Sequence, residues 1–85
     1  MNKKDTLVNA TERFSLGIDE VSKQYYFSIP VSNRLVDYEE YYELTEQEYR
    51  TLMTDSALAT LFAADCRAHR LDARLMTKPG ADRGV

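Results

Sequence analysis

The sequence changes its hydrophobic period at Thr45, and this change limits the chain to folds in which strands precede helices. The Thr45 side chain can accept a hydrogen bond from the backbone amide of Glu48, and the Glu48 carboxylate can reach back to the amide of Thr45. This arrangement is a capping box. Leu44 before the cap and Tyr49 in the first helical turns form the matching hydrophobic staple. The sequence therefore predicts that a helix begins directly after Thr45.

Before this point, apolar residues alternate with polar ones over residues 13–18 and again over residues 23–31. A period of two is typical of half-buried strands, and the short polar connection predicts an antiparallel hairpin. A third run, residues 35–44, predicts the next strand of a meander. Glu40 falls on the apolar face of this strand, so we expect it either to lie at the rim or to be turned outward by a bulge. Pro30 lacks an amide hydrogen, which places the end of the second strand at a sheet edge or outside the ladder.

After Thr45 the pattern predicts two helices rather than one. The apolar side chains of residues 49–53 and of residues 58–66 would point in opposite directions on one continuous helix. Good N-cap residues lie between them, so we expect a short helix over residues 46–53 and a longer one over about residues 56–70. Residues 72–77 fit either a fourth short strand or an extension of the longer helix.

The chain of 85 residues is long enough for one domain and too short for two. We expect an α+β domain over residues 11–78. Its three- to four-stranded antiparallel sheet, a meander, is packed on one face by the short helix and the longer C-terminal helix. Residues 1–10 are expected to be a flexible leader and residues 79–85 a flexible tail. The predicted core contains Phe14, Leu16, Ile18, Phe27, Ile29, Val36, Leu52, Leu58, Leu61 and Phe62.

Negative charge is concentrated in the middle of the chain. Residues 36–55 carry seven acidic side chains and one basic one, whereas the flanking segments are mildly basic and the whole chain has a net charge of −3. Affinity for nucleic acid needs a net basic surface and is not expected. An acidic patch favours a basic protein partner. No apolar run reaches the roughly 20 residues that span a membrane.

Cys66 is the only cysteine, which excludes an internal disulfide and is typical of a protein of the reducing cytoplasm. On a continuous helix Cys66 and His69 would be neighbours, and they could supply two zinc ligands or a thiolate and a base. Cys66 also shares an apolar face with Phe62, which favours a buried, inert thiol. The glycines form no phosphate-binding loop. We therefore expect no metal, no cofactor and no catalytic residue.

Asp37, Glu39, Tyr41 and Glu43 alternate on the outer face of the third predicted strand, and Tyr26 falls on the same face of the strand before it. Tyrosine is enriched at protein interfaces, so these five residues are the predicted binding surface. The alternative is that Tyr26 and Tyr41 pair with each other across the strands while the carboxylates keep the face solvated.

The leading hypothesis is a small, non-catalytic, intracellular protein-binding domain that uses this acidic and aromatic sheet surface. Such a surface suits an inhibitor or immunity-type protein that covers the basic active site of a nuclease or another toxin. The alternative is a homo-oligomer, for example a homodimer, that associates through its sheet, because small cores often need such support. A third hypothesis is a thiol- or metal-dependent activity at Cys66 and His69.

Overall fold

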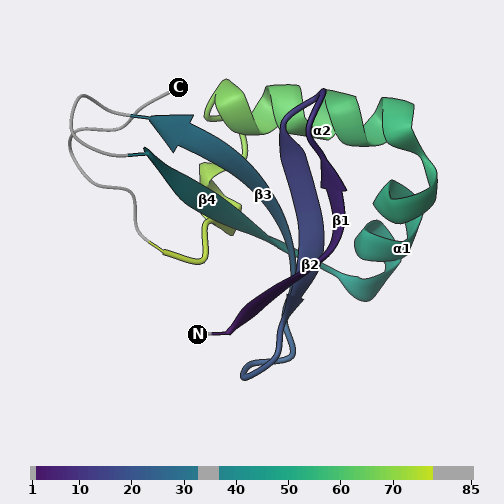
Figure 1. Ribbon diagram of the computed structural model, residues 1–85, viewed down its shortest axis with the longest axis vertical. Coiled ribbons are helices and arrows are strands. Elements are labelled where there is room, and N and C mark those ends of the chain that lie inside the picture. Colours follow the sequence, from purple (N-terminus) through teal and green to yellow (C-terminus); the bar gives the residue numbers. More distant parts are fainter. Residues whose placement is uncertain (1, 33–36, 78–85) are drawn as a thin grey trace.

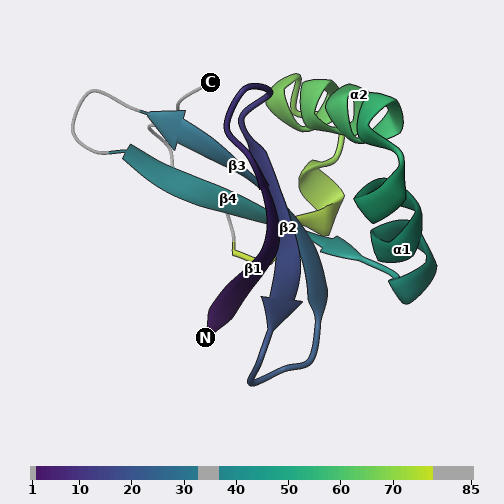
Figure 2. The ribbon, with the colours of Figure 1, turned by 45° about the vertical axis from the view of Figure 1, so that its right-hand side comes forward.

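The computed structural model describes residues 2–32 and 37–77. Four antiparallel strands form one sheet in sequence order: β1 (Lys3–Asn9), β2 (Phe14–Asp19), β3 (Tyr25–Ser32) and β4 (Asp37–Leu44). The helical elements follow: α1 (Glu46–Thr54), α2 (Ser56–Arg67) and the short 3₁₀ helix η1 (Asp72–Arg74). Both long helices lie on one side of the twisted sheet (Figures 1 and 2), and within the described ranges no helix covers the other face. The predicted α+β meander is confirmed.

The outermost strand comes from the N-terminal segment, so the expectation of a flexible leader is wrong for residues 3–9. β1 pairs antiparallel with β2, with a bulge between Asp5 and Leu7. The Thr6 hydroxyl lies 2.6 Å from the hydroxyl of Tyr49, which joins β1 to α1. β1 is an edge strand with mostly exposed side chains. Leu7 packs against the core, but the other contacts of β1 are mainly backbone and polar ones, which leave no apolar alternation in the sequence.

Residues 72–77 do not form the fourth strand that was one of the two expectations for this segment. Asp72–Arg74 is the 3₁₀ helix η1, and Leu75 makes an isolated bridge to Tyr42. The amide of Met76 donates to the Tyr41 carbonyl at 2.9 Å, so this segment lies against the outer edge of β4. Residues 79–85, the expected tail, lie outside the described residues.

The core lies between the sheet and the helices. Of the ten predicted core residues, Phe14, Leu16, Phe27, Ile29 and Leu52 are buried, Ile18 and Phe62 are half-buried, and Val36 lies outside the described residues. Leu58 and Leu61 are wrong, because they are 42% and 64% exposed. The face of α2 that meets the sheet carries small side chains instead, namely Ala59, Ala63 and Cys66.

Both sides of α2 carry apolar residues, so the hydrophobic pattern does not determine which side packs on the sheet. The small buried residues allow the α2 backbone to approach the sheet closely, and Phe62 at the border of this face packs on Phe27 with ring centroids 4.7 Å apart. The larger leucines are left on the outside. Placing the largest apolar residues in the core was therefore the wrong criterion for this helix.

Both helices begin where the sequence predicts, but α2 ends earlier than predicted. The capping box is formed, with Glu48 N donating to Thr45 Oγ1 at 3.1 Å and Thr45 N donating to Glu48 Oε1 at 2.8 Å. Asp55 caps α2. α2 ends at Arg67 rather than at residue 70, because His69 has a left-handed backbone with φ of 62°. The amides of His69 and Arg70 donate back into the last turn in a Schellman motif. The sequence has no glycine there to signal it.

Two unusual residues in the strands are accommodated without distortion of β3 and β4. At Pro30 the missing amide hydrogen costs no ladder bond, since β2 pairs with β3 only as far as Ser28. Glu40 lies on the helix side and is 5% exposed, and the Tyr42 hydroxyl donates to it at 2.9 Å. The pairing of β3 with β4 shows no register shift, so the bulge that could have turned Glu40 outward is not present there.

Glu48 and Arg74 connect the start of α1 with the C-terminal segment. The Arg74 guanidinium donates to both Glu48 carboxylate oxygens, at 2.9 and 2.7 Å, and to the Glu43 carbonyl at 3.1 Å. It also lies 5.6 Å from the centroid of the Phe62 ring. The hydrogen bonds from Arg74 lower the pKa of Glu48 from 4.5 to about 2. One carboxylate thus completes the capping box and also holds η1 in place.

Replacing Ala63 by leucine is expected to destabilise the protein by about 1–3 kcal/mol, because the extra carbons would be forced between α2 and the sheet. The matched control is Leu61→Ala on the exposed side of α2, which should change the free energy of unfolding by less than about 1 kcal/mol. Urea unfolding followed by circular dichroism measures both. A larger loss for Leu61→Ala than for Ala63→Leu would show that α2 packs in the opposite orientation.

Replacing Glu48 by glutamine should change how stability depends on pH. The folded-state pKa of Glu48 is depressed, so its stabilisation is complete above pH 4.5 and is lost as the pH falls towards 2. At pH 6 the free energy of unfolding of wild type should be about 1–2 kcal/mol higher than that of Glu48→Gln, a value already reduced for solvent screening. This difference should vanish as the pH approaches 2. Urea titrations at several pH values measure it. A difference that stays constant over this range would contradict the role of the Glu48–Arg74 pair.

Candidate interaction surface

The pairing of β3 with β4 brings all five predicted surface residues to the face of the sheet that carries no helix. Tyr26 lies opposite Glu43, Ser28 opposite Tyr41, Pro30 opposite Glu39 and Ser32 opposite Asp37. Tyr25, Phe27 and Ile29, which alternate with these β3 positions, point to the helix side. We call the helix-free side the open face, and its residues come from all of the strands.

β1 and β2 add residues to the open face that the sequence analysis missed. The register places Lys3 opposite Asp19 and Asp5 opposite Gly17. Lys3 and Asp5 were missed because residues 1–10 were expected to be a leader, and Asp19 was missed because it was expected to be part of the turn after residues 13–18. A usable signal was Asn9, whose side chain accepts from the amide of Glu12 at 2.9 Å and so organises the turn before β2.

Tyr26 is a structural residue and not an exposed part of a binding surface, which corrects its predicted role. Its side chain is fully buried although it lies on the open face, because the ring crosses the strand at Gly17. Its hydroxyl donates to Asp5 Oδ1 at 2.5 Å. Burial, and then the hydrogen bond to Asp5, raise the pKa of Tyr26 well above its ordinary value. Tyr26 therefore fastens β1 to the sheet as a neutral phenol.

Tyr41 is the aromatic residue of the open face that stays partly accessible. Its ring meets that of Tyr26 edge-on, with centroids 5.1 Å apart, so the expected alternative of cross-strand pairing is confirmed for this contact. The Lys3 ammonium lies 4.7 Å from the Tyr41 ring centroid. Burial, followed by the negative charges of Glu39 and Asp5, raises the pKa of Tyr41. The ring is thus held in place while one part of it remains at the surface.

Asp19 is the buried acidic residue of this face, with 1% of its surface exposed. Lys3 Nζ lies 3.0 Å from its Oδ2, and the amides of Val21 and Ser22 donate to its Oδ1 at 2.9 and 3.3 Å. The hydrogen bond from Lys3, aided by these backbone amides, holds the pKa of Asp19 well below its usual range. Asp19 is therefore an ionised structural residue whose acceptor positions are used within the protein.

The three exposed carboxylates on β4 differ in their surroundings. Asp37 accepts from the Ser32 hydroxyl at 2.6 Å. Partial desolvation and the nearby charge of Asp5 raise the pKa of Glu39, although a hydrogen bond from Ser28 opposes the shift. Within residues 2–32 and 37–77, no ion pair is formed by Asp37, Glu39 or Glu43. The open face therefore presents negative charge that the described part of the chain does not neutralise.

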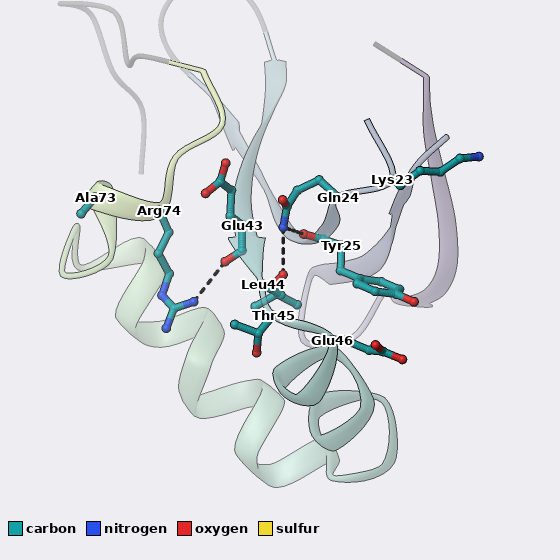
Figure 3. Close-up of a pocket in the computed structure, with 9 residues that line it drawn as sticks. All are labelled: Lys23, Gln24, Tyr25, Glu43, Leu44, Thr45, Glu46, Ala73 and Arg74. Carbon is teal, nitrogen blue, oxygen red and sulfur yellow. Dashed lines mark hydrogen bonds between the residues drawn. The ribbon is translucent and has the colours of Figure 1, made fainter. Parts of the chain in front are cut away.

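The end of the sheet near Glu43, beside the start of α1, is hollowed. A wide, open depression between the β2–β3 turn, the end of β4 and η1 is lined by nine residues, from Lys23 to Arg74 (Figure 3). In it, the side-chain amide of Gln24 donates to the Leu44 carbonyl at 2.9 Å and to the Tyr25 carbonyl at 3.2 Å. The Glu43 carboxylate points away from the guanidinium of Arg74, which contacts Glu43 through the backbone carbonyl and not through the carboxylate (Figure 3).

Cys66 and His69 are not arranged as the third hypothesis would need. Cys66 is fully buried, and burial raises the pKa of its thiol to about 12, so the reactive thiolate is suppressed. His69 is exposed and lies beyond the end of α2. Among the described residues, no three His, Cys, Asp or Glu side chains are grouped so that they could hold a metal ion.

Comparison of the chain with protein-family models, with curated proteins and with solved structures gives no match. Within the part of the chain that the structure describes, no helix has the length and apolar character required to cross a membrane. The functional argument therefore depends on the chemistry of the open face.

Replacing Gly17 by alanine should detach β1. A Cβ atom at this position would collide with the carbonyl oxygen of Lys4 and lie 2.5 Å from the phenol oxygen of Tyr26. The expected loss is about 1–3 kcal/mol in the free energy of unfolding, with faster amide hydrogen exchange in residues 3–9. The control is Ser15→Ala on the same face of β2, which should leave β1 protected. If residues 3–9 of Gly17→Ala exchange as slowly as in wild type, the packing of Tyr26 across Gly17 does not hold β1.

Proposed function

We propose that the chain is a non-catalytic protein-binding domain whose open face docks on a basic protein. The observation that carries this proposal is a sheet face that no described helix covers. On it, Asp37, Glu39 and Glu43 form no ion pair with the described residues and lie beside the half-buried ring of Tyr41. A basic partner would gain Coulomb attraction over the whole face, which steers association and excludes acidic partners. Tyr41 supplies a fixed aromatic surface of the kind enriched in interface hot spots.

One form of this function is that of a small inhibitor or immunity-type protein that covers the basic active site of a toxin. A rigid acidic face suits this role, because a partner that binds a polyanion presents clustered lysines and arginines. The buried free thiol of Cys66 is compatible with the reducing cytoplasm, where we place the protein.

Self-association is the second proposal, with its surface moved from the sheet to α2. Edge pairing of the sheet is disfavoured, since β1 carries a bulge and two lysines and β4 is met by residues 75–76. Leu58 and Leu61 are instead exposed on the outside of α2. Light scattering over a dilution series tests this, because a monomer at every concentration excludes it.

The binding proposal is tested by reversing charge on the open face. Three proteins are immobilised and incubated with lysate of cells that express the protein: wild type, the open-face variant Glu39→Lys/Glu43→Lys, and the control Glu12→Lys/Glu46→Lys. The control has the same net charge as the open-face variant. Captured proteins are identified by mass spectrometry. A basic partner should be retained by wild type and by the control and lost from the open-face variant.

The recovered partner then allows the electrostatic mechanism to be measured by stopped flow. Its association rate with the open-face variant should fall at least about tenfold at low salt, and its salt dependence should flatten. Equal association rates for the open-face variant and for the control would show that the open face is not the docking surface.

A further inference from the structure

A second hollow, next to Glu43, extends the open face where β2 turns into β3. It has a volume of about 260 Å³, many times the roughly 30 Å³ that one water occupies in the liquid. Its walls come from the β2–β3 turn, β4 and the C-terminal segment, and the lining residues are Asp19, Val21, Ser22, Gln24, Glu43 and Met76. We call it the Glu43 hollow, and it is large enough to admit one side chain of a partner.

The polar groups that the Glu43 hollow offers to a ligand are mainly acceptors. Both amide hydrogens of Gln24 are used on the carbonyls of Tyr25 and Leu44, which leaves its side-chain oxygen. The carboxylate of Asp19 is occupied by Lys3 and by backbone amides. The Glu43 carboxylate has no side-chain partner among the described residues (Figure 3). A ligand that fits must therefore donate hydrogen bonds and gains from carrying positive charge.

The apolar part of the wall limits the ligand further. Val21 is 74% exposed at the tip of the β2–β3 turn, and Met76 adds a flexible thioether. Lysine and arginine combine an aliphatic stem with a cationic head that bears several donors. A bare metal ion is a poor fit, because a hard cation takes about six oxygen ligands and apolar walls supply none.

We infer that the Glu43 hollow receives one lysine or arginine side chain of the basic partner, with its stem against Val21 and Met76 and its cationic head on the Glu43 carboxylate. This inference rests on the proposed function and specifies where the partner is anchored. It separates a single specific position from the diffuse attraction of the rest of the open face. Neutral substitutions in the apolar wall should therefore weaken binding, although they leave every charge unchanged.

The experiment measures the dissociation constants of fluorescein-labelled hexa-arginine and hexa-lysine peptides by anisotropy at low salt. Val21→Ser is paired with Val8→Ser. Val8 is also an exposed valine on the open face, but it lies on β1, opposite Ser15, and does not line the Glu43 hollow. Glu43→Gln is paired with Glu39→Gln, which removes the same charge from the same strand. We expect Val21→Ser and Glu43→Gln to weaken binding at least fivefold and Val8→Ser less than twofold, whereas Glu39→Gln, which removes only diffuse attraction, should weaken binding clearly less than Glu43→Gln.

The outcomes separate the inference from the function. If Val21→Ser matches Val8→Ser and Glu43→Gln matches Glu39→Gln, cations bind the open face diffusely, and the Glu43 hollow is overturned while the basic-partner proposal stands. If neither peptide binds wild type, the inference is also overturned, and the capture experiment with Glu39→Lys/Glu43→Lys then decides the function on its own. Larger amide chemical-shift changes at Val21 and Gln24 than at Val8 would support the Glu43 hollow directly.

Discussion

The buried carboxylate of Asp19 is the interaction on which the open half of the structure depends. It closes the β2–β3 turn by accepting from the amides of Val21 and Ser22, and it holds β1 through Lys3. Lys3 in turn lies over the ring of Tyr41 on β4. Removing this one charge would take one partner from the Lys3 ammonium and the side-chain acceptor from the amides of Val21 and Ser22. The turn, the edge strand and the exposed aromatic residue are therefore linked through one side chain.

The two faces of the sheet are stabilised by different means. Towards the helices, apolar side chains pack against small residues of α2, and the Glu48–Arg74 pair fixes the chain beyond the helices. On the open face, Tyr26 lies across Gly17 and donates to Asp5, so aromatic and polar groups exclude water without a second layer. Among the described residues, this division leaves the open face with exposed carboxylates and without a covering helix.

The sequence predicted those elements whose signals are local. The capping box at Thr45, the break at Asp55 and the alternation of β2, β3 and β4 depend on neighbouring residues, and the structure agrees with them. β1 was missed because an edge strand with a single residue packed on the core, Leu7, has no apolar period. The end of α2 was missed because His69, and not a glycine, adopts the left-handed conformation.

The sequence predicted which residues of the candidate surface share a face of the sheet, but not which of them are buried. Period-two alternation places Asp37, Glu39, Tyr41 and Glu43 on one face, and the register confirms this placement. Alternation alone cannot show that Tyr26 is covered, because its burial depends on a glycine in β2 and an aspartate in β1. Likewise, the face of α2 that packs on the sheet is chosen by side-chain size and fit, which a hydrophobic pattern does not measure.

The order of the elements along the chain also affects how the protein emerges from the ribosome. All of the strands precede both long helices, so the side of the sheet that carries Phe27 and Ile29 is synthesised before α2 exists to cover it. The growing chain therefore passes through a stage in which a partly formed meander exposes its apolar side, a condition that favours aggregation during translation. The acidic residues that follow in β4 and at the start of α1 add like charge to such intermediates, and like charge opposes their association.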